Sequence, residues 1–226
     1  MEEYIKKTMT ALEKNNMKAY YVETREEVVP LIKTLLNKGE TISNGGSETL
    51  FETGVFSEIL ESDDYDFADR RGLEGEDLRQ IYIRAYGADT YFCSSNAVTE
   101  RGELYNVDGN SNRVSCIVYG PKQVIMIVGK NKIVPNIDAA IKRVKEISAP
   151  ANCNRLNCLT PCSKTGHCIS LDTENPFICD GCHSAARVCC NYVVTAQQRH
   201  KDRIKVIIVN ENLGYSNAKN PCKRNV

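Results

Sequence analysis

The sequence gathers thiols into one stretch, since eight of the eleven cysteines lie between Cys153 and Cys190. Thiols crowded together bind a metal ion or an iron–sulfur cluster, form disulfides, or remain unpaired as small buried apolar side chains. The first residues, MEEYIKKTMTALEKNNM, include acidic residues and no apolar run of signal-peptide length. We therefore expect a cytoplasmic protein. Because stable disulfides are rare in a reducing cytosol, metal or cluster ligation is the favoured role of this stretch.

The spacing of these cysteines indicates which of them could share a metal. Cys179 and Cys182 form a tight Cys-x-x-Cys pair, which lets two thiolates reach one ion. Cys162, Cys168 and Cys189 are the candidates for the remaining ligands. Four thiolates suit either Zn²⁺ or a [4Fe–4S] cluster, so the choice between them stays open. A redox-active dithiol at Cys179 and Cys182 is the alternative.

A glycine-rich turn, GGSET, runs from Gly45 through Gly46, Ser47 and Glu48 to Thr49, after a short strand-like run and before a helical pattern. Glycines let the backbone approach an anion, and the free N–H groups at a helix start favour negative charge. The hydroxyls of Ser47 and Thr49 are further donors. The alternative is a simple capping turn with Ser47 as the cap. The turn has neither the dinucleotide-binding fingerprint nor the P-loop motif.

Two more polar loops, at residues 95–100 and 108–113, bracket an expected hairpin strand at 104–107. Open α/β sheets bind ligands at loops that follow the carboxyl ends of strands, so we predict a composite site for a small carboxylate or phosphate. Glu100 and Glu48 are candidate bases or nucleophiles, and Arg113 is a candidate clamp for a carboxylate. Turn chemistry is the alternative explanation of the Asp-Gly and Asn-Ser pairs. The predicted ligand-binding set is Gly45, Gly46, Ser47, Thr49, Ser95, Asn96, Asp108, Asn112 and Arg113.

The elements that position these residues alternate along the chain. Helical patterns cover 2–15, 24–36, 75–86 and 135–147, and strand-like runs cover 18–22, 40–43, 90–93, 114–119, 123–128 and 204–209. Such alternation predicts an α/β fold with a parallel-rich central sheet flanked by helices. The runs at 114–119 and 123–128 are strongly apolar, as in strands that are buried on both faces, and the run at 204–209, IKVIIV, is expected to be a core strand.

Composition narrows the classes of partner. Lys plus Arg number 29 and Asp plus Glu number 29, so no net charge attracts nucleic acid or an acidic membrane surface. No apolar run approaches the length of a membrane span, so no membrane insertion is expected. With strands expected on both sides of it, residues 151–200 are predicted to be a Cys-rich excursion from a single domain covering 1–226.

Two stretches resemble the lactate-utilisation protein family, whose domain is called LUD. They are SNGGSETLFETG at 43–54 and SSNAVTERGELYNVDGNSNRVSCIVYGPKQVIMIVGKNKIV at 94–134. The later segments TPCSKTGHC, CDGC, RVCCN and VIIVNENLGY resemble the Cys-bearing tail of many members. The sequence departs from the family pattern at Ser94, where glycine is usual, and between Cys168 and Cys179, which lie closer together in many members.

This resemblance implies a fold related to sugar-phosphate isomerases and coenzyme-A transferases. It also implies a role in bacterial oxidation of L-lactate to pyruvate, alongside iron–sulfur partner proteins. Two alternatives remain. One is a transferase or isomerase that uses Glu48 or Glu100 at the same site. The other is a non-catalytic subunit in which the metal only stabilises a docking loop.

Overall fold

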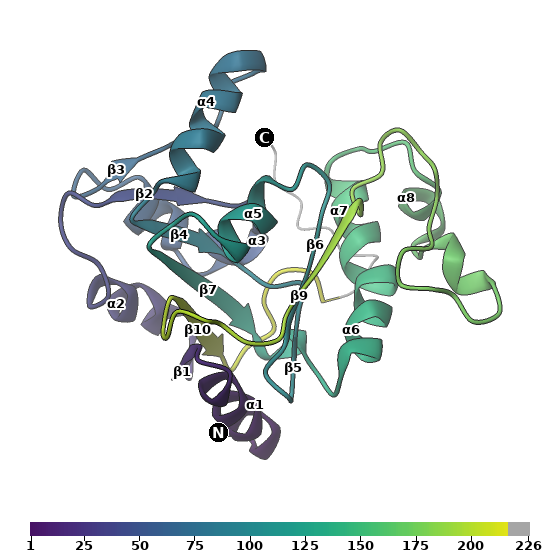
Figure 1. The fold of residues 1–226 in the computed structure, drawn as a ribbon, viewed down its shortest axis with the longest axis horizontal. Helices are drawn as coiled ribbons and strands as arrows, with labels where there is room; N and C mark the ends of the chain where they lie inside the picture. The colour runs from purple at the N-terminus through teal and green to yellow at the C-terminus, as the bar shows by residue number, and fades with distance from the viewer. Residues whose placement is uncertain (217–226) are drawn as a thin grey trace.

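A six-stranded parallel sheet forms the centre of the computed structural model, which describes residues 1–216 (Figure 1). The strand order is β1-β10-β7-β4-β2-β3, and all neighbouring pairs are parallel. The strands are β1 (Lys18–Val22), β2 (Thr41–Asn44), β3 (Asp66–Phe67), β4 (Thr90–Cys93), β7 (Gln123–Gly129) and β10 (Ile204–Val209). The expected parallel-rich α/β fold is confirmed.

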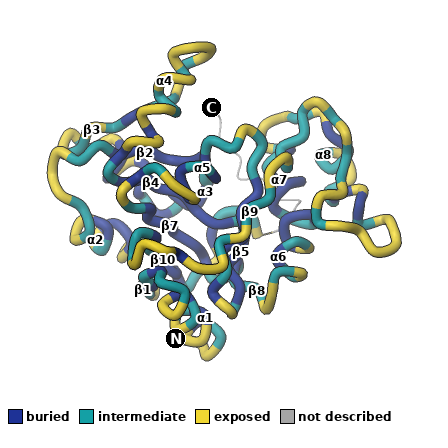
Figure 2. Tube along the Cα trace, in the orientation of Figure 1, coloured by how far each residue is buried: buried dark blue, intermediate teal, exposed yellow. Residues whose placement is uncertain are grey.

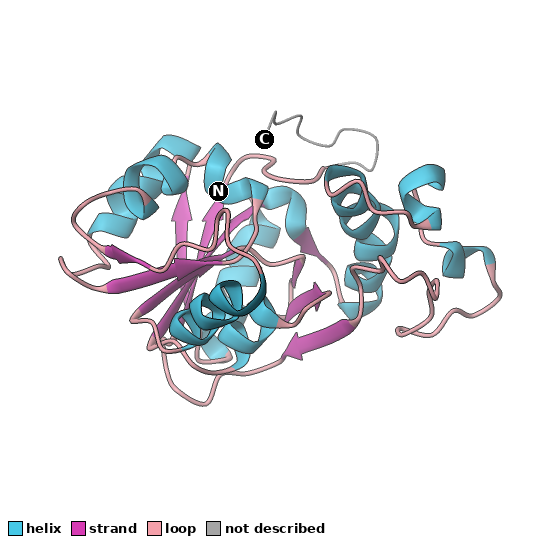
Figure 3. Cartoon of the chain, turned by 90° about the horizontal axis from the view of Figure 1, so that it is seen from above, coloured by secondary structure: helices cyan, strands magenta, loops and turns pink. Residues whose placement is uncertain are grey.

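The apolar strands of this sheet separate two cores. Along β7, Val124, Met126 and Val128 face one cluster, whereas Ile125 and Ile127 face the other. Such two-sided burial is what strands without polar alternation require. One core packs against α1 (Glu3–Lys14), α4 (Gly75–Tyr86) and α5 (Asn112–Val118). The other packs against α2 (Val28–Lys33), α3 (Glu48–Glu52) and the π-helical turn η2 (Phe56–Leu60). Figure 3 shows helices on both faces of the sheet.

A second, four-stranded sheet stands beside the first, in the order β8-β5-β6-β9. Its strands are β5 (Ala97–Thr99), β6 (Leu104–Asp108), β8 (Ile133–Val134) and β9 (Asn191–Thr195). The antiparallel pair of β5 and β6 is the hairpin expected around 104–107. A third core lies between this sheet and α6 (Ile137–Arg143) with its continuation η4 (Val144–Ser148). The helix then runs on as α7 (Ala149–Arg155).

The strand predicted at 114–119 is wrong, because residues 114–118 belong to helix α5 and Tyr119 follows its end. Both ends of this helix are stabilised from outside it. The Asp108 carboxylate accepts hydrogen bonds from the backbone N–H groups of Arg113 and Val114, at 3.0 Å each. The Arg203 guanidinium donates to the carbonyls of Cys116 and Ile117 at 2.9 and 2.7 Å. These contacts satisfy end groups that a seven-residue helix otherwise leaves unpaired.

The Cys-rich segment, defined here as residues 157–190, has little core of its own. It contains the short helix α8 (Pro161–Thr165), the 3₁₀ turn η5 (Ile169–Asp172) and otherwise irregular backbone. In this fully described range only Thr160, Cys168 and Ser170 are buried. Figure 2 shows the segment as a mostly exposed or half-buried loop on the far side of α7 from the central strands. Among residues 1–216, no helix has the length and apolar character that crossing a membrane demands.

Candidate functional site

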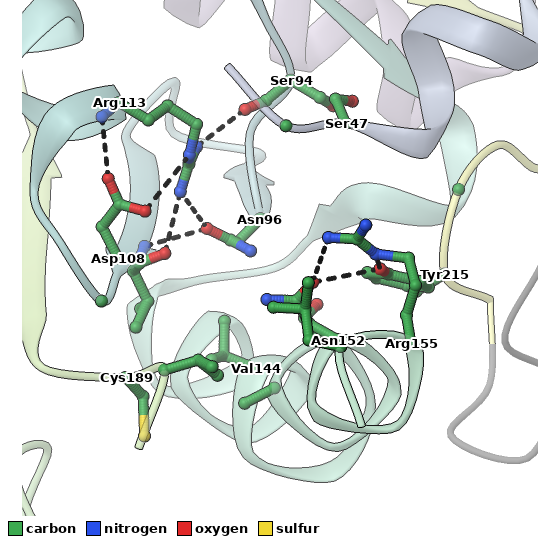
Figure 4. Close-up of a pocket in the computed structure, with 18 of the residues that line it drawn as sticks. Ser47, Ser94, Asn96, Asp108, Arg113, Val144, Asn152, Arg155, Cys189 and Tyr215 are labelled. Carbon is green, nitrogen blue, oxygen red and sulfur yellow. Dashed lines mark hydrogen bonds and ion pairs between the residues drawn. The ribbon is translucent and has the colours of Figure 1, made fainter. Parts of the chain in front are cut away.

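A cavity of about 490 Å³, called the anion cavity below, lies where loops from both sheets converge (Figure 4). The turns after β2 and β4 form one wall, and the end of β6 with the start of α5 forms a second. Helices α6 and α7 close the opposite side, together with residues 185–189 of the Cys-rich segment. The carboxyl-end rule for open α/β sheets places β2 and β4 at this edge.

Most of the predicted binding residues line this cavity. The structure brings together Gly46, Ser47, Glu48, Thr49, Ser95, Asn96, Asp108, Asn112 and Arg113. Their side chains come from loops that are far apart in the sequence, which makes a composite site geometrically possible. That they bind a ligand stays a prediction. Gly45 and Glu100 are not among the lining residues.

Glu100 is held away from the cavity by another partner. Its carboxylate accepts a hydrogen bond from the Lys7 ammonium of α1 at 2.8 Å. Its own N–H donates to the carbonyl of Val134 at 2.8 Å, beyond the end of β5. Since strand β5 leads away from the cavity, the residue that follows it cannot reach a ligand there. The structure therefore does not support Glu100 as the base of this site.

Arg113 is a positioning residue, and the clamp predicted for it is not what the structure shows. Its guanidinium donates to the carbonyls of Ser94 and Val107, at 3.0 and 2.8 Å. It also donates to the amide oxygens of Asn106 and Asn96, at 2.7 and 2.9 Å. These bonds occupy the donors that a bidentate carboxylate would need. Arg113 instead ties the β4 turn to the end of β6.

The Asn96 amide is oriented by this network. Its oxygen accepts from Arg113 and also from the backbone N–H of Val107, at 2.9 Å in each case. With the oxygen so fixed, the amide nitrogen points toward the side that carries Arg155 and Asn152, as Figure 4 shows. Asn96 thus presents a donor to the cavity.

The absence of a side chain at Gly45 leaves room for the Arg113 side chain, which passes close to the Gly45 backbone. A Cβ atom at position 45 would lie 2.8 Å from both the Cγ and Cδ atoms of Arg113, closer than real contacts allow. The N–H of Gly45 is already bonded to the carbonyl of Phe92 at 2.9 Å, as a continuation of the sheet. Gly45 therefore serves packing, and the predicted role of its N–H as an anion donor is not supported.

The cavity also contains basic side chains that have no acidic partner. Lys132, 6% exposed, donates to the hydroxyls of Thr49 and Ser94 at 2.8 and 2.7 Å. Among residues 1–216, Arg143, 7% exposed, donates to backbone carbonyls and to the Ser148 hydroxyl. Within residues 1–216 neither side chain forms an ion pair with a carboxylate. Burial lowers the pKa of Lys132 to about 7, with a smaller contribution from Arg143, and burial lowers the pKa of Arg143 to about 10.

Arg70 and Arg155 add positive charge nearer the surface. In the described part of the chain, the Arg70 guanidinium has neither a hydrogen-bond acceptor nor an ion-pair partner. Arg155 donates to the Tyr215 hydroxyl at 2.8 Å and to the Asn152 amide oxygen at 2.9 Å. Its Nε atom lies 3.7 Å from a carboxylate oxygen of Glu48, a buried residue. Glu48 is thus an acidic group of the cavity that lies beside Arg155.

Charge in the cavity is strongly unbalanced. The basic lining residues are Arg70, Arg113, Lys132, Arg143, Arg155 and Arg187, and the acidic ones are Glu48 and Asp108. Because the whole chain carries no net charge, this is a local concentration. Buried cations without counter-charges are costly, and an anionic ligand would relieve that cost. The cavity is therefore suited to an anion.

A second, much smaller cavity, called the thiol cavity below, lies behind the wall formed by η4 and α7. Its volume is about 20 Å³. Four of the five predicted metal ligands line it, namely Cys162, Cys168, Cys182 and Cys189. Cys179 is exposed and does not line it. Among the residues described here, no three His, Cys, Asp or Glu side chains are already arranged to hold an ion, so metal binding stays a prediction.

Two other cysteines behave as ordinary core residues. Cys93 and Cys116 are buried in the core that packs on α1 and α5. Burial raises the pKa of the Cys93 thiol to about 12 and that of Cys116 to about 11. Both thiols are therefore protonated at neutral pH.

Sequence reasoning missed several cavity residues. Lys132 and Ser94 follow β7 and β4, so the carboxyl-end rule applied to every strand would have found both. Arg143 and Arg155 lie on helices, where a basic residue is usually solvent-exposed. Arg70 follows the two-residue strand β3, which is too short to leave a pattern in the sequence.

Comparison with known families fits this architecture. The model of the LUD domain matches residues 5–209. The chain belongs to the LUD family. A solved structure of a DUF162 family protein from Deinococcus radiodurans is similar, with a TM-score of 0.51 and 13% identity, covering 92% of this LUD chain and 97% of that protein. At this identity the likeness concerns the fold alone. No curated protein matches the sequence.

Membership gives a general functional setting. The LUD family is linked in general to lactate utilisation. The matched range includes the Cys-rich segment and the lining residues of the anion cavity other than Gly214 and Tyr215. Most of both cavities is therefore part of the LUD domain of this chain.

Proposed function

We propose that the anion cavity binds a small carboxylate, L-lactate or pyruvate, in the oxidation of L-lactate. The observation that carries this proposal is a set of cations that lack carboxylate partners in residues 1–216. Lys132 and Arg143 are buried and Arg70 is half-buried. A carboxylate at the cavity floor would accept from Lys132, and the Asn96 amide could donate to a hydroxyl or keto oxygen.

In this reaction L-lactate loses two electrons and two protons to become pyruvate. Iron–sulfur partner proteins, which the family resemblance implies, are the proposed acceptors of the electrons. The residues of this chain hold and orient the carboxylate. Lys132 pairs with that carboxylate in its ammonium form, which is present at and below pH 7 because its pKa in the free cavity is about 7.

Isothermal titration calorimetry in phosphate-free buffer tests the binding step with L-lactate, pyruvate and inorganic phosphate as ligands. We expect the carboxylates to bind, and Arg70→Gln to weaken binding about tenfold or more through the loss of a charge-assisted hydrogen bond. Arg79→Gln is the matched control, since Arg79 is exposed on α4 and pairs only with Glu76. Absence of binding by both carboxylates would refute the proposal.

A transferase or isomerase acting through Glu48 is the second candidate. Glu48 is buried in the cavity wall and lies 3.7 Å from Arg155, a suitable place for a base or nucleophile. The Glu48→Gln variant distinguishes this candidate from the carboxylate-binding proposal. If Glu48 only adds repulsion, the variant binds carboxylates more tightly than the wild type. If it performs chemistry, the variant binds ligand but loses turnover.

A further inference from the structure

Two thiols from consecutive helices are in contact. Cys153 lies on α7 and Cys162 on α8, and their sulfur atoms are 3.7 Å apart. Helix α8 lies beside α7 (Figure 1). Within residues 1–216 this is the only hydrogen bond between two thiols, and both cysteines are free. The pair is therefore a candidate for reversible disulfide chemistry.

Backbone hydrogen bonds hold the turn that brings these two thiols together. Just after α7, the N–H of Cys158 donates to the Cys153 carbonyl at 2.9 Å. The N–H of Thr160 then donates to the Cys158 carbonyl at 2.9 Å, and the Ser163 hydroxyl donates to the Thr160 carbonyl at 2.7 Å, at the start of α8. The approach of the two thiols is therefore set by the chain between them.

The two thiols differ in their access to solvent. Cys153 is 1% exposed. Cys162 is half-buried, with the Thr160 hydroxyl 3.4 Å from its sulfur atom. Because the rate of thiol–disulfide exchange depends on access to the sulfur, a reagent in solution reacts first with Cys162. Cys153 is then the thiol that attacks the product of this first reaction, and each cysteine has a distinct part.

We propose that Cys153 and Cys162 form a thiol oxidation site whose oxidant is a small disulfide. The Cys162 thiolate attacks one sulfur of the small disulfide, which forms a mixed disulfide and releases one small thiol. The Cys153 thiolate then attacks the Cys162 sulfur, which forms the internal disulfide and releases the second small thiol. The proton that each cysteine loses ends on a released small thiol. The pair thus gives two electrons to the oxidant, and an external dithiol reverses the reaction.

Closing this bond requires only local movement. The two sulfur atoms must approach from 3.7 Å to about 2.05 Å. Helix α8 can shift toward α7, because none of its residues is buried. In the reducing compartment that the sequence predicts, such a disulfide is transient, as it is in redox-sensing proteins.

Oxidation would act on two neighbouring features. Asn152 and Arg155 of α7 line the anion cavity, whereas Cys153, which lies between them in the sequence, does not. A disulfide would therefore hold this wall of the cavity from behind. It would also remove Cys162 from the predicted metal ligands. The oxidation site itself depends on neither carboxylate nor metal binding, because it needs only the two thiols.

Peptide mapping of the full chain tests the pair. The reduced protein is treated with a stoichiometric amount of oxidised glutathione, and the remaining thiols are alkylated. Trypsin then separates Cys153, in peptide 146–155, from Cys162, in peptide 156–164. We expect a disulfide between these two peptides that is several-fold more abundant than any other disulfide in the digest and that dithiothreitol removes. This result in the wild type does not depend on any variant.

Two variants assign the bond to its cysteines. Cys158→Ser is the matched control, because Cys158 lies in the same peptide as Cys162, and this variant should keep the full yield of linked peptides. Cys153→Ser should stop at a glutathione adduct on Cys162. Linked peptides that disappear in Cys158→Ser would assign the bond to Cys158 and overturn the proposal. Glutathione adducts on the exposed Cys179 and Cys190 of the wild type, with no link between the two peptides, would also overturn it.

Discussion

At the scale of single residues, the anion cavity is defined by basic side chains that form no ion pair with a described carboxylate. Lys132 is the clearest case, because it sits among cations and hydroxyls and forms no ion pair with a described carboxylate. Its ordinary pKa of 10.5 falls to about 7 in the fold. A bound carboxylate would raise this pKa again, so binding of the anion takes up a proton.

The first prediction follows from the titration of Lys132. Below pH 7 the free protein holds the ammonium form, and affinity for L-lactate or pyruvate should be highest. Above pH 7 affinity should fall, by up to tenfold per pH unit, because binding must first protonate the amine. Calorimetry between pH 6 and pH 8.5 measures this slope. Lys132→Met should bind more weakly, and its affinity should not depend on pH in this range. If the variant keeps the pH dependence, the titrating group is not Lys132.

Lys132 also affects stability, which gives a second prediction. Its folded pKa lies below its unfolded value, so the unfolded chain binds more protons between about pH 7 and pH 10.5 and stability rises with pH there. Below pH 7 the cost of burying the ammonium is fully present. Lys132→Met should therefore unfold at higher urea concentration than the wild type, with the largest gain at or below pH 7 and little gain near pH 10.

A third prediction concerns the close approach of Gly45 and Arg113. Gly45→Ala places a Cβ atom 2.8 Å from two carbon atoms of a side chain that is fixed by four hydrogen bonds. We expect a loss of about 1–3 kcal/mol in the free energy of unfolding. Gly87→Ala is the control, since its Cβ atom would have an ordinary 3.7 Å contact. Equal stability of the two variants would contradict this account.

At the scale of elements, helix α5 shows where local patterns mislead. The run at 114–119 is rich in β-branched and aromatic residues, and its own sequence favours a strand. The contacts that make it a helix come from Asp108 and Arg203. Because Arg203 lies far along the chain, no local window contains this signal.

Arg203 therefore carries the fourth prediction. It is half-buried and donates to the Cys116, Ile117 and Pro121 carbonyls. Replacing it with an apolar side chain removes these three hydrogen bonds. Arg203→Met should lower the free energy of unfolding by about 1–3 kcal/mol. Arg199→Met, at an exposed position nearby, should leave it unchanged. Urea denaturation followed by circular dichroism gives both values. If Arg203→Met leaves the free energy of unfolding unchanged, α5 is stable without this cap.

The elements that sequence predicted well are those whose signal is local. The strands at 18–22, 90–93 and 204–209 and the helix at 75–86 have the expected bounds. The turn after β2 and the loop after β4 meet at one edge as predicted, because parallel strands align their carboxyl ends. The opposite wall of the cavity could not be predicted, since α6, α7 and residues 185–189 reach it only through the second sheet and its core.

At the scale of the whole molecule, the apolar burial belongs to three cores that lie almost entirely outside the Cys-rich segment. If the Cys-rich segment binds the metal predicted from its sequence, a chelator should therefore release residues 157–190 and leave the unfolding temperature of the α/β core nearly unchanged. Trypsin should then cut after Lys164 and Arg187, as mass spectrometry of the fragments can show. If chelation unfolds the whole chain, the metal supports the core instead.

Arg187 contacts both cavities. It lines the anion cavity, and the same guanidinium is bonded to the backbone on both sides of the thiol cavity. Val144, Ala149 and Cys189 are likewise common to both linings. Because the two cavities share this wall, metal binding in the thiol cavity and carboxylate binding in the anion cavity would be linked equilibria if both occur. Whatever factor the metal applied to carboxylate affinity, the carboxylate would apply to metal affinity.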